Sequence, residues 1–139
     1  MSAYQQWKKL GKPTDHLMEC WLLSQSNIPT TADDHVWAEW ELSDLASDDP
    51  EKAWECILYA VPDTRFSDHL GLLAAGVLKN LLSYHGPDFI DRVEHQAKVD
   101  PKFAWTLGGV WRFQMSDEIW HRVQAVWDRS GWDGIPAKA

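Results

Sequence analysis

Apolar residues recur at helical spacing between proline and glycine stops along almost the whole chain, whereas strand-like alternation is weak. A chain with this pattern buries its apolar stripes by packing helix against helix, so the pattern predicts an all-α protein. Seven or eight short helices are expected, either as a compact helical bundle or as a short α-solenoid of HEAT type. The predicted helices start at Tyr4, Thr14, Thr30 or Thr31, Pro50, Ser67, Asp88, Pro101 and Ser116.

The segment from Ser67 to Ser83 is the most apolar part of the chain, with apolar residues on nearly all sides of the expected helix. This helix is therefore predicted to lie at the centre of the protein. The sequence His-Gly-Pro-Asp at residues 85–88 predicts a helix stop followed at once by a new start.

Tryptophan is unusually frequent, with ten in 139 residues, and most of these rings are expected in the core or at interfaces. Near the C-terminus, Trp111 falls at helical spacing in the helix that starts at Pro101, and Trp120 and Trp127 of the last helix are predicted to pack inward. Gly131 is expected to end the last helix, with Trp132 folded back on its final turn.

A weak internal repeat connects two segments 51 residues apart. Residues 49–54 and residues 100–105 both read Asp-Pro-x-x-Ala-Trp. Two helix pairs related in this way are typical of a short solenoid. The alternative is that Asp-Pro is simply a common way to start a helix.

The two cysteines, Cys20 and Cys56, lie in apolar helical contexts and in no metal-ligand spacing. The N-terminal residues lack a signal-peptide pattern, and no stretch approaches the ~18 apolar residues of a membrane span. The sequence therefore predicts a cytoplasmic protein with two reduced thiols and no membrane contact. A disulfide between the cysteines stays open as an alternative without supporting evidence.

The negative charge of the protein is concentrated in one short stretch. The formal net charge is -8, and residues 33–51 hold eight acids and no lysine or arginine. The other 13 acids are matched by all 13 lysines and arginines, so the rest of the chain is neutral. This asymmetry argues against direct nucleic-acid binding and favours a basic protein partner. The eight acids are Asp33, Asp34, Glu39, Glu41, Asp44, Asp48, Asp49 and Glu51.

On a helix, five of these acids share one face, Trp37 falls in their middle and Trp40 lies at the edge. A large ring among carboxylates fits an interaction surface in which an aromatic anchor is surrounded by steering charges. The alternative is an ordinary solvated face. The candidate partner-binding residues are Asp33, Asp34, Trp37, Trp40, Glu41, Asp44 and Asp48.

From about residue 48 onward the chain resembles a family of small, mostly uncharacterised bacterial proteins of unknown function. The motifs are LAAG at 73–76, LLSYHGP at 81–87, FIDRVE at 89–94 and WDRSGWD at 127–133. The resemblance implies an all-helical protein and no reaction. It divides the single domain 1–139 into N-terminal helices with the acidic segment (1–47) and a family-like helical core (48–136). Small helical proteins of this general kind often occur as immunity proteins or inhibitors beside toxins, which is an association only.

Catalytic and metal-binding patterns are incomplete. Glu118 and His121 have the spacing of di-metal carboxylate bundles, and Asp91 and His95 share a helical face, but neither pair has a second half. His85 precedes Gly-Pro, where a role at a helix stop is favoured over catalysis. The sequence therefore predicts no catalytic residues, no metal and no cofactor.

Three functions follow from these patterns. The favoured one is a protein-binding inhibitor, specifically an immunity protein that neutralises a basic toxin by occlusion through its acidic face. The first alternative is a structural or scaffold domain that forms a homodimer through exposed tryptophans. The second is a metal-binding enzyme.

Overall fold

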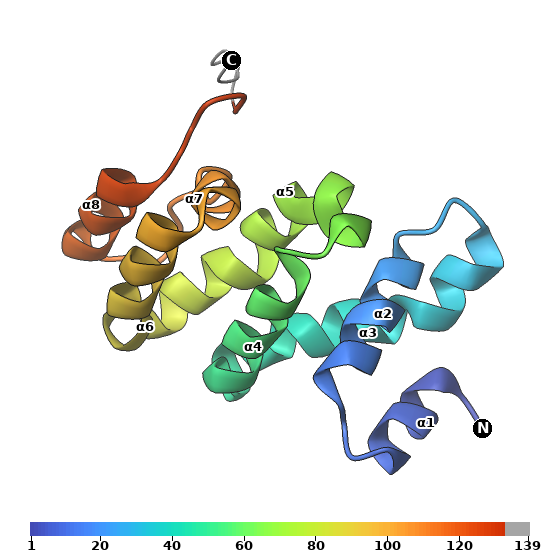
Figure 1. Cartoon of the computed structure of the whole chain (residues 1–139). Helices are drawn as coiled ribbons and strands as arrows, with labels where there is room; N and C mark the ends of the chain where they lie inside the picture. Colours follow the sequence, from blue (N-terminus) through green and yellow to red (C-terminus); the bar gives the residue numbers. More distant parts are fainter. Residues whose placement is uncertain (133–139) are drawn as a thin grey trace.

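The computed structural model describes residues 1–132, which fold into helices with short connections (Figure 1). The all-α prediction is confirmed, and residues 1–132 contain no strand. None of their helices combines the length and the apolar character that crossing a membrane requires. The elements, including the 3-10 segment η1 and the π-helical segment η2, are α1 (Ala3–Lys9), α2 (Thr14–Ser24), α3 (Pro29–Asp48), α4 (Pro50–Ala60), η1 (Thr64–His69), α5 (Leu70–Leu73), η2 (Ala74–Leu78), α6 (Lys79–Val99), α7 (Pro101–Leu107) and α8 (Asp117–Val126).

The elements follow one another broadly in chain order, from α1 at one end of the molecule to α8 at the other (Figure 1). The two longest helices, α3 with 20 residues and α6 with 21, pack against each other between these ends. Helices α1, α2 and α4 contact α3, whereas α4, α7 and α8 contact α6. The other helices therefore pack onto the pair α3–α6, and the two ends of the molecule have separate surfaces.

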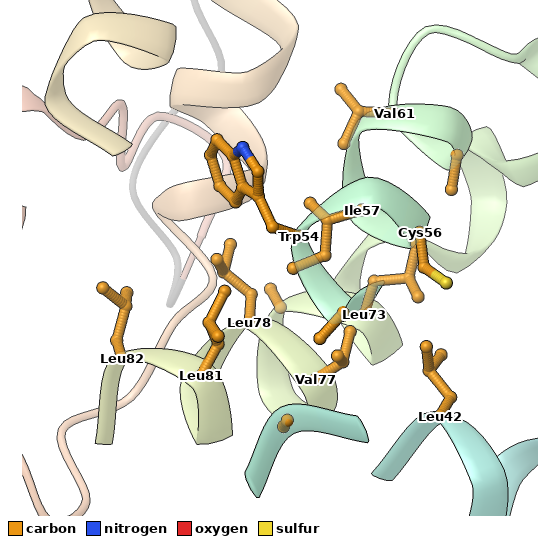
Figure 2. Close-up of a cluster of buried hydrophobic side chains, with 14 of the residues drawn as sticks. Leu42, Trp54, Cys56, Ile57, Val61, Leu73, Val77, Leu78, Leu81 and Leu82 are labelled. Carbon is orange, nitrogen blue, oxygen red and sulfur yellow. The ribbon is translucent and has the colours of Figure 1, made fainter. Parts of the chain in front are cut away.

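The core between α3, α4 and α6 is apolar (Figure 2). Trp54 and Ile57 of α4 face Leu78 and Leu81 on the helical segment below them, and Leu42 closes the cluster from α3. Trp54 is the most exposed of these five side chains, at 8%. Burial of large apolar side chains contributes roughly 1.5–3 kcal/mol each, so this cluster is a main source of stability.

The predicted central position of residues 67–83 is confirmed, but these residues do not form one regular helix. The backbone passes from the 3-10 segment η1 through α5 and the π-helical η2 into α6. A π-helical stretch widens the turn locally and is typically confined to one turn inside α-helices.

The predicted stop and immediate restart at residues 85–88 is confirmed as a break, because His85 has non-helical dihedral angles (φ -132°, ψ 25°) and two helical stretches of α6 meet there at a kink. Pro87 is tolerated there, since it occupies the first turn after the kink, where its missing N–H has no helical partner to lose. The Nε2–H of His85 donates to the Ser47 carbonyl over 2.9 Å, which connects the kink to the last turn of α3. His85 therefore has a structural role.

Helix α3 begins at Pro29, earlier than the sequence predicted. Pro29 occupies the first helical position, and Ile28 precedes it without a side-chain cap. The predicted caps Thr30 and Thr31 lie inside the helix and are wrong, because proline at the first position is itself a start signal.

The two Asp-Pro sequences start corresponding helices. Asp49 caps α4 by accepting from the Lys52 backbone N–H over 3.3 Å. Asp100 caps α7 by accepting from the Lys102 N–H over 3.0 Å. Each of the two helices follows a long one, α3 or α6, so the repeat has a structural counterpart in the helix pairs α3–α4 and α6–α7.

The C-terminal predictions are partly wrong. Helix α7 ends at Leu107, and Trp111 lies beyond it with 67% of its surface exposed. Helix α8 ends at Val126, well before Gly131. Trp132 folds back onto α7, where its ring centre lies 4.6 Å from that of Trp105 and its Nε1–H donates to the Trp105 carbonyl.

Two glycines offer a matched test of this packing. A Cβ on Gly108 would lie 2.0 Å from the Asp128 carbonyl oxygen, whereas a Cβ on Gly76 would meet no atom within 4 Å. Gly108→Ala must displace the backbone of the C-terminal segment, so we expect it to lower the free energy of unfolding by roughly 1–3 kcal/mol. Gly76→Ala should leave it unchanged or raise it, since alanine is favoured over glycine in helices by about 1 kcal/mol. Urea unfolding of both variants measures the difference, and equal losses would contradict the packing described.

Candidate docking surface on helix α3

Helix α3 turns one face to the core and the opposite face to solvent. Ala38, Leu42 and Ala46 are buried, whereas Trp40 is 66% exposed on the other side. The neighbouring acids are exposed as well, apart from the half-buried Glu41. We define the acidic α3 surface as Asp33, Asp34, Trp40, Glu41, Asp44 and Asp48.

The carboxylates of the acidic α3 surface have no cationic partner within residues 1–132. One of them, Asp48, accepts a hydrogen bond from Ser47 Oγ over 3.1 Å. Charges that are exposed and unneutralised set the potential over this side of the protein, and this potential attracts cations.

Three further acids of the segment serve the fold. Glu39 accepts hydrogen bonds from Gln25 Nε2 (2.8 Å) and Ser24 Oγ (3.2 Å) at the end of α2. Glu51 forms a two-pronged ion pair with Arg92 of α6 over 2.6 and 2.7 Å, and the pKa of Glu51 is lowered by these hydrogen bonds. With Asp49 as the cap of α4, these acids are accounted for by local structure.

Trp37 does not present its ring to a partner. Helix α1 covers this part of α3, and the Trp37 ring centre lies 5.3 Å from that of Tyr4 and 5.4 Å from that of Trp7. The side chain is half-buried, and its Nε1–H is buried with no hydrogen-bond partner. Trp37 therefore holds α1 onto α3, and Trp40 is the exposed aromatic side chain of the candidate set.

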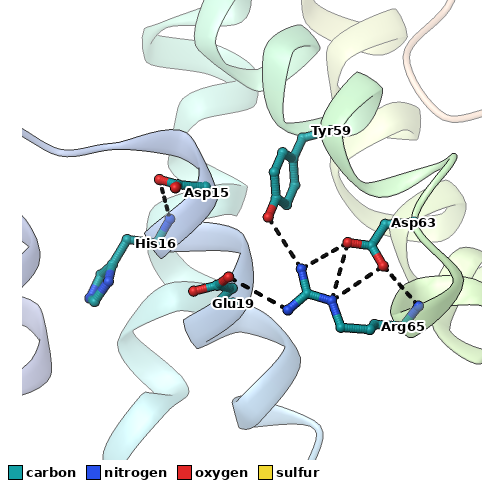
Figure 3. A network of polar contacts seen from close by, with 6 residues as sticks. All are labelled: Asp15, His16, Glu19, Tyr59, Asp63 and Arg65. Carbon is teal, nitrogen blue, oxygen red and sulfur yellow. Dashed lines mark hydrogen bonds and ion pairs between the residues drawn. The ribbon is translucent and has the colours of Figure 1, made fainter.

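A second polar cluster, which sequence patterns did not reveal, surrounds Arg65 (Figure 3). Its guanidinium group donates to both carboxylate oxygens of Asp63 and, over 3.2 Å, to the Tyr59 hydroxyl. The same group lies 3.5 Å from Glu19 of α2. These hydrogen bonds lower the pKa of Asp63. The cluster joins α2 to the end of α4 and supports a structural role.

The candidate metal pairs do not form a site. Within residues 1–132, no three histidine, cysteine, aspartate or glutamate side chains are close enough to hold a metal ion. Asp91 instead pairs with Arg122, which also binds Glu94 and so joins α8 to α6.

A cleft at the opposite end of the molecule was missed because Trp111 was expected within a helix, whereas α7 ends at Leu107. Trp111, beyond the end of α7, is exposed. It lines the same cleft as Trp120 of α8 and Trp127, which directly follows α8. The cleft is lined by Val110, Trp111, Arg112, Trp120, Trp127 and Arg129. The neighbouring Trp-Arg pair at 111–112 and the Trp-Asp-Arg sequence at 127–129 were its only signals in the sequence.

Comparison with known proteins gives a family without an assigned activity. The model of a family of unknown function (DUF6869) matches residues 25–131. The chain belongs to this family. The family match begins at residue 25 rather than near residue 48, so it includes the whole of α3 and its acids. No curated protein and no solved structure matches the chain.

Substitution of Trp37 tests whether this residue stabilises the fold. Trp37→Phe removes the buried N–H without a partner and keeps a ring against Tyr4 and Trp7, so the free energy of unfolding should stay equal or rise. Trp37→Ala removes the ring contact and should lower it by about 2 kcal/mol, less than the ~3–5 kcal/mol of a fully buried aromatic residue. Chemical denaturation measures both values. A neutral Trp37→Ala would show that α1 does not depend on this ring.

The two buried thiols give a pH-dependent prediction. Burial raises the pKa of Cys20, and it raises that of Cys56 to about 12. An unfolded cysteine has a pKa of about 8.5, so above that pH the unfolded chain loses its proton first and is favoured. The free energy of unfolding should therefore fall between about pH 8.5 and pH 12, and less steeply in Cys56→Ala. Identical pH slopes in the two proteins would contradict this assignment.

Proposed function

We propose that this family member is a protein-binding protein that docks a basic partner through the acidic α3 surface. The observation that carries the proposal is Trp40, which is 66% exposed among carboxylates that have no cationic partner within residues 1–132. Exposed aromatic anchors surrounded by charge are typical of binding hot spots.

The placement of the acids supports binding over stability. Asp44 and Asp48 lie in the last two turns of α3, where the helix dipole disfavours negative charge. They are also four residues apart, a spacing at which like charges on a helix repel. Because these charges oppose the helix that carries them, a gain outside the fold explains them better than a contribution to it.

Charge complementarity defines the expected partner. A basic surface would be steered towards α3 from a distance, and its rate of association would fall as salt screens the charges. The Trp40 ring would then be buried in the contact and would supply apolar area that persists at higher salt.

The specific form of the proposal is an inhibitor, an immunity protein acting in the cytoplasm on a basic toxin. In a toxin that cleaves nucleic acid, cationic side chains of the active site bind phosphates. The carboxylates of α3 would occupy the positions of those phosphates, and the helix would block access to the site.

A symmetric homodimer through the same surface is disfavoured by its charge. A two-fold contact places the same patch on both copies, so the acids of α3 would face one another. Light scattering at low salt should therefore give the mass of a monomer for contacts of this kind. A dimer that Trp40→Ala dissociates would support the scaffold alternative.

The binding proposal is tested by affinity capture with quantitative mass spectrometry. Four baits are compared: the full chain, its Asp44→Lys/Asp48→Lys variant, Trp40→Ala and Trp111→Ala. Trp111→Ala is the control, because the Trp111 side chain is as exposed as that of Trp40 (67%) but lies at the other end of the molecule. We expect one basic protein to be captured by the unmodified chain and by Trp111→Ala. Its recovery should fall at least tenfold with the other two baits, and with increasing salt.

The opposite pattern would contradict the proposal. If charge reversal on α3 leaves every captured protein at the same level, the surface is not a docking site. If the lost partner is acidic, or if the loss is shared by Trp111→Ala, charge complementarity at α3 does not explain the binding.

A further inference from the structure

The cleft beyond α7 differs from the acidic α3 surface in place and in chemistry. It has a volume of about 240 Å³ and lies between the connection from α7 to α8 and the segment that follows α8. Helix α8 is at the opposite end of the molecule from α1, which covers part of α3 (Figure 1). We define the tryptophan cleft by its lining residues Val110, Trp111, Arg112, Trp120, Trp127 and Arg129.

The side chains of the tryptophan cleft can donate hydrogen bonds but cannot accept them. An indole has a single N–H donor, a guanidinium group has five donors and no acceptor, and valine has neither. The indole N–H groups of Trp111, Trp120 and Trp127 donate to no group in the described part of the chain. No carboxylate, amide or hydroxyl side chain is part of the lining. A ligand for this lining must therefore supply acceptors.

The rings of the cleft form apolar walls. The centres of the Trp120 and Trp127 rings are 5.2 Å apart and nearly perpendicular, at 86°. The guanidinium carbon of Arg129 lies over the Trp127 ring, 4.9 Å from its centre. Trp111 stands at the rim with 67% of its surface exposed, although it is a large apolar side chain. These faces suit a flat ring, which stacks on indole at small entropic cost.

Arg112 is one of the two cationic side chains that line the cleft. Its Nη2 donates to the Met115 carbonyl and to the Asp117 carboxylate, which holds the guanidinium group in place. Both bonds come from the same nitrogen, so the Nε and Nη1 donors of Arg112 bind no other group within residues 1–132. Both edges that can give two parallel hydrogen bonds include Nη2, so Arg112 can offer a ligand carboxylate single charge-assisted hydrogen bonds from Nε or Nη1 but not a parallel pair.

We infer that the tryptophan cleft binds a small aromatic anion, a single flat ring that carries a carboxylate. The ring would stack on the exposed Trp111 indole, and the carboxylate would accept hydrogen bonds from Arg112 and from an indole N–H. The volume of about 240 Å³ lies below the roughly 300–1,000 Å³ of pockets for drug-sized ligands, which fits one ring. This inference does not depend on the proposed role of α3.

Benzoate is the probe for this inference. The full chain, labelled with nitrogen-15, is titrated with benzoate while the indole N–H resonances are followed by NMR. Benzamide serves as the neutral ligand of the same shape, and acetate as the carboxylate without a ring. We expect benzoate to shift the resonances of Trp111, Trp120 and Trp127, assigned by single Trp→Phe variants, and to bind at least tenfold more tightly than either control.

Four variants locate the site. Trp111→Ala and Arg112→Gln should each weaken benzoate binding at least fivefold, whereas Trp40→Ala, which removes an equally exposed ring at the other end, should not change it. Asp117→Asn removes the charge that holds the Arg112 guanidinium group in place, so it should also weaken benzoate binding. Far-UV circular dichroism confirms that each variant is folded.

Three outcomes would overturn the inference. Benzoate would shift no indole resonance of the cleft, or benzamide and acetate would bind as tightly as benzoate. Alternatively, folded Trp111→Ala and Arg112→Gln would bind benzoate as well as the unmodified chain does.

Discussion

The packing of α3 against α6 is the contact on which the remaining elements depend. Helices α1 and α2 are held by α3, α7 and α8 are held by α6, and α4 contacts both. The side chains of α3 that are fully buried are Ala38, Leu42 and Ala46, and α1 covers the part of the opposite face around Trp37. The packing of the core therefore leaves Trp40 and the acids beside it exposed on α3.

Ion pairs and helix caps stabilise the other contacts between helices. The acids that take part in them are structural, which distinguishes them from the candidate binding acids. Glu51 bonds to Arg92 between α4 and α6, and Glu94 bonds to Arg122 between α6 and α8. The pKa values of both glutamates are lowered by these hydrogen bonds. No comparable partner exists within residues 1–132 for the acids of the α3 surface, which explains why the local charge excess stays uncompensated.

Much of the fold follows from the sequence, because helix starts and apolar spacing are local signals. Asp-Pro at residues 49–50 and 100–101 predicted two helix starts that the structure confirms. Tertiary contacts decided the rest. The break at residues 85–88 was predicted, but its hydrogen bond from His85 to Ser47, 38 residues away, was not, and neither was the contact of Trp132 with Trp105. No spacing rule contains such distant partners.

The candidate site was predictable only in part for the same reason. Helical periodicity correctly placed Trp40 and four of the acids on an exposed face. The same periodicity put Trp37 among them, but α1 covers that ring, and the contact with Tyr4 and Trp7 is set by a different helix. The tryptophan cleft was missed because α7 ends early, at Leu107, and turns Trp111 outward.

The central claim is that the outer acids of α3 do not serve the fold, and the stability of the double variant Asp44→Asn/Asp48→Asn tests it most directly. The measurement is the free energy of urea unfolding at low salt, beside the unmodified chain. Removing two like charges near the negative end of a helix should raise this value by several tenths of a kcal/mol up to about 1 kcal/mol, and added salt should shrink the gain. A clear loss of stability would contradict the claim, because it would show that these carboxylates hold the structure together.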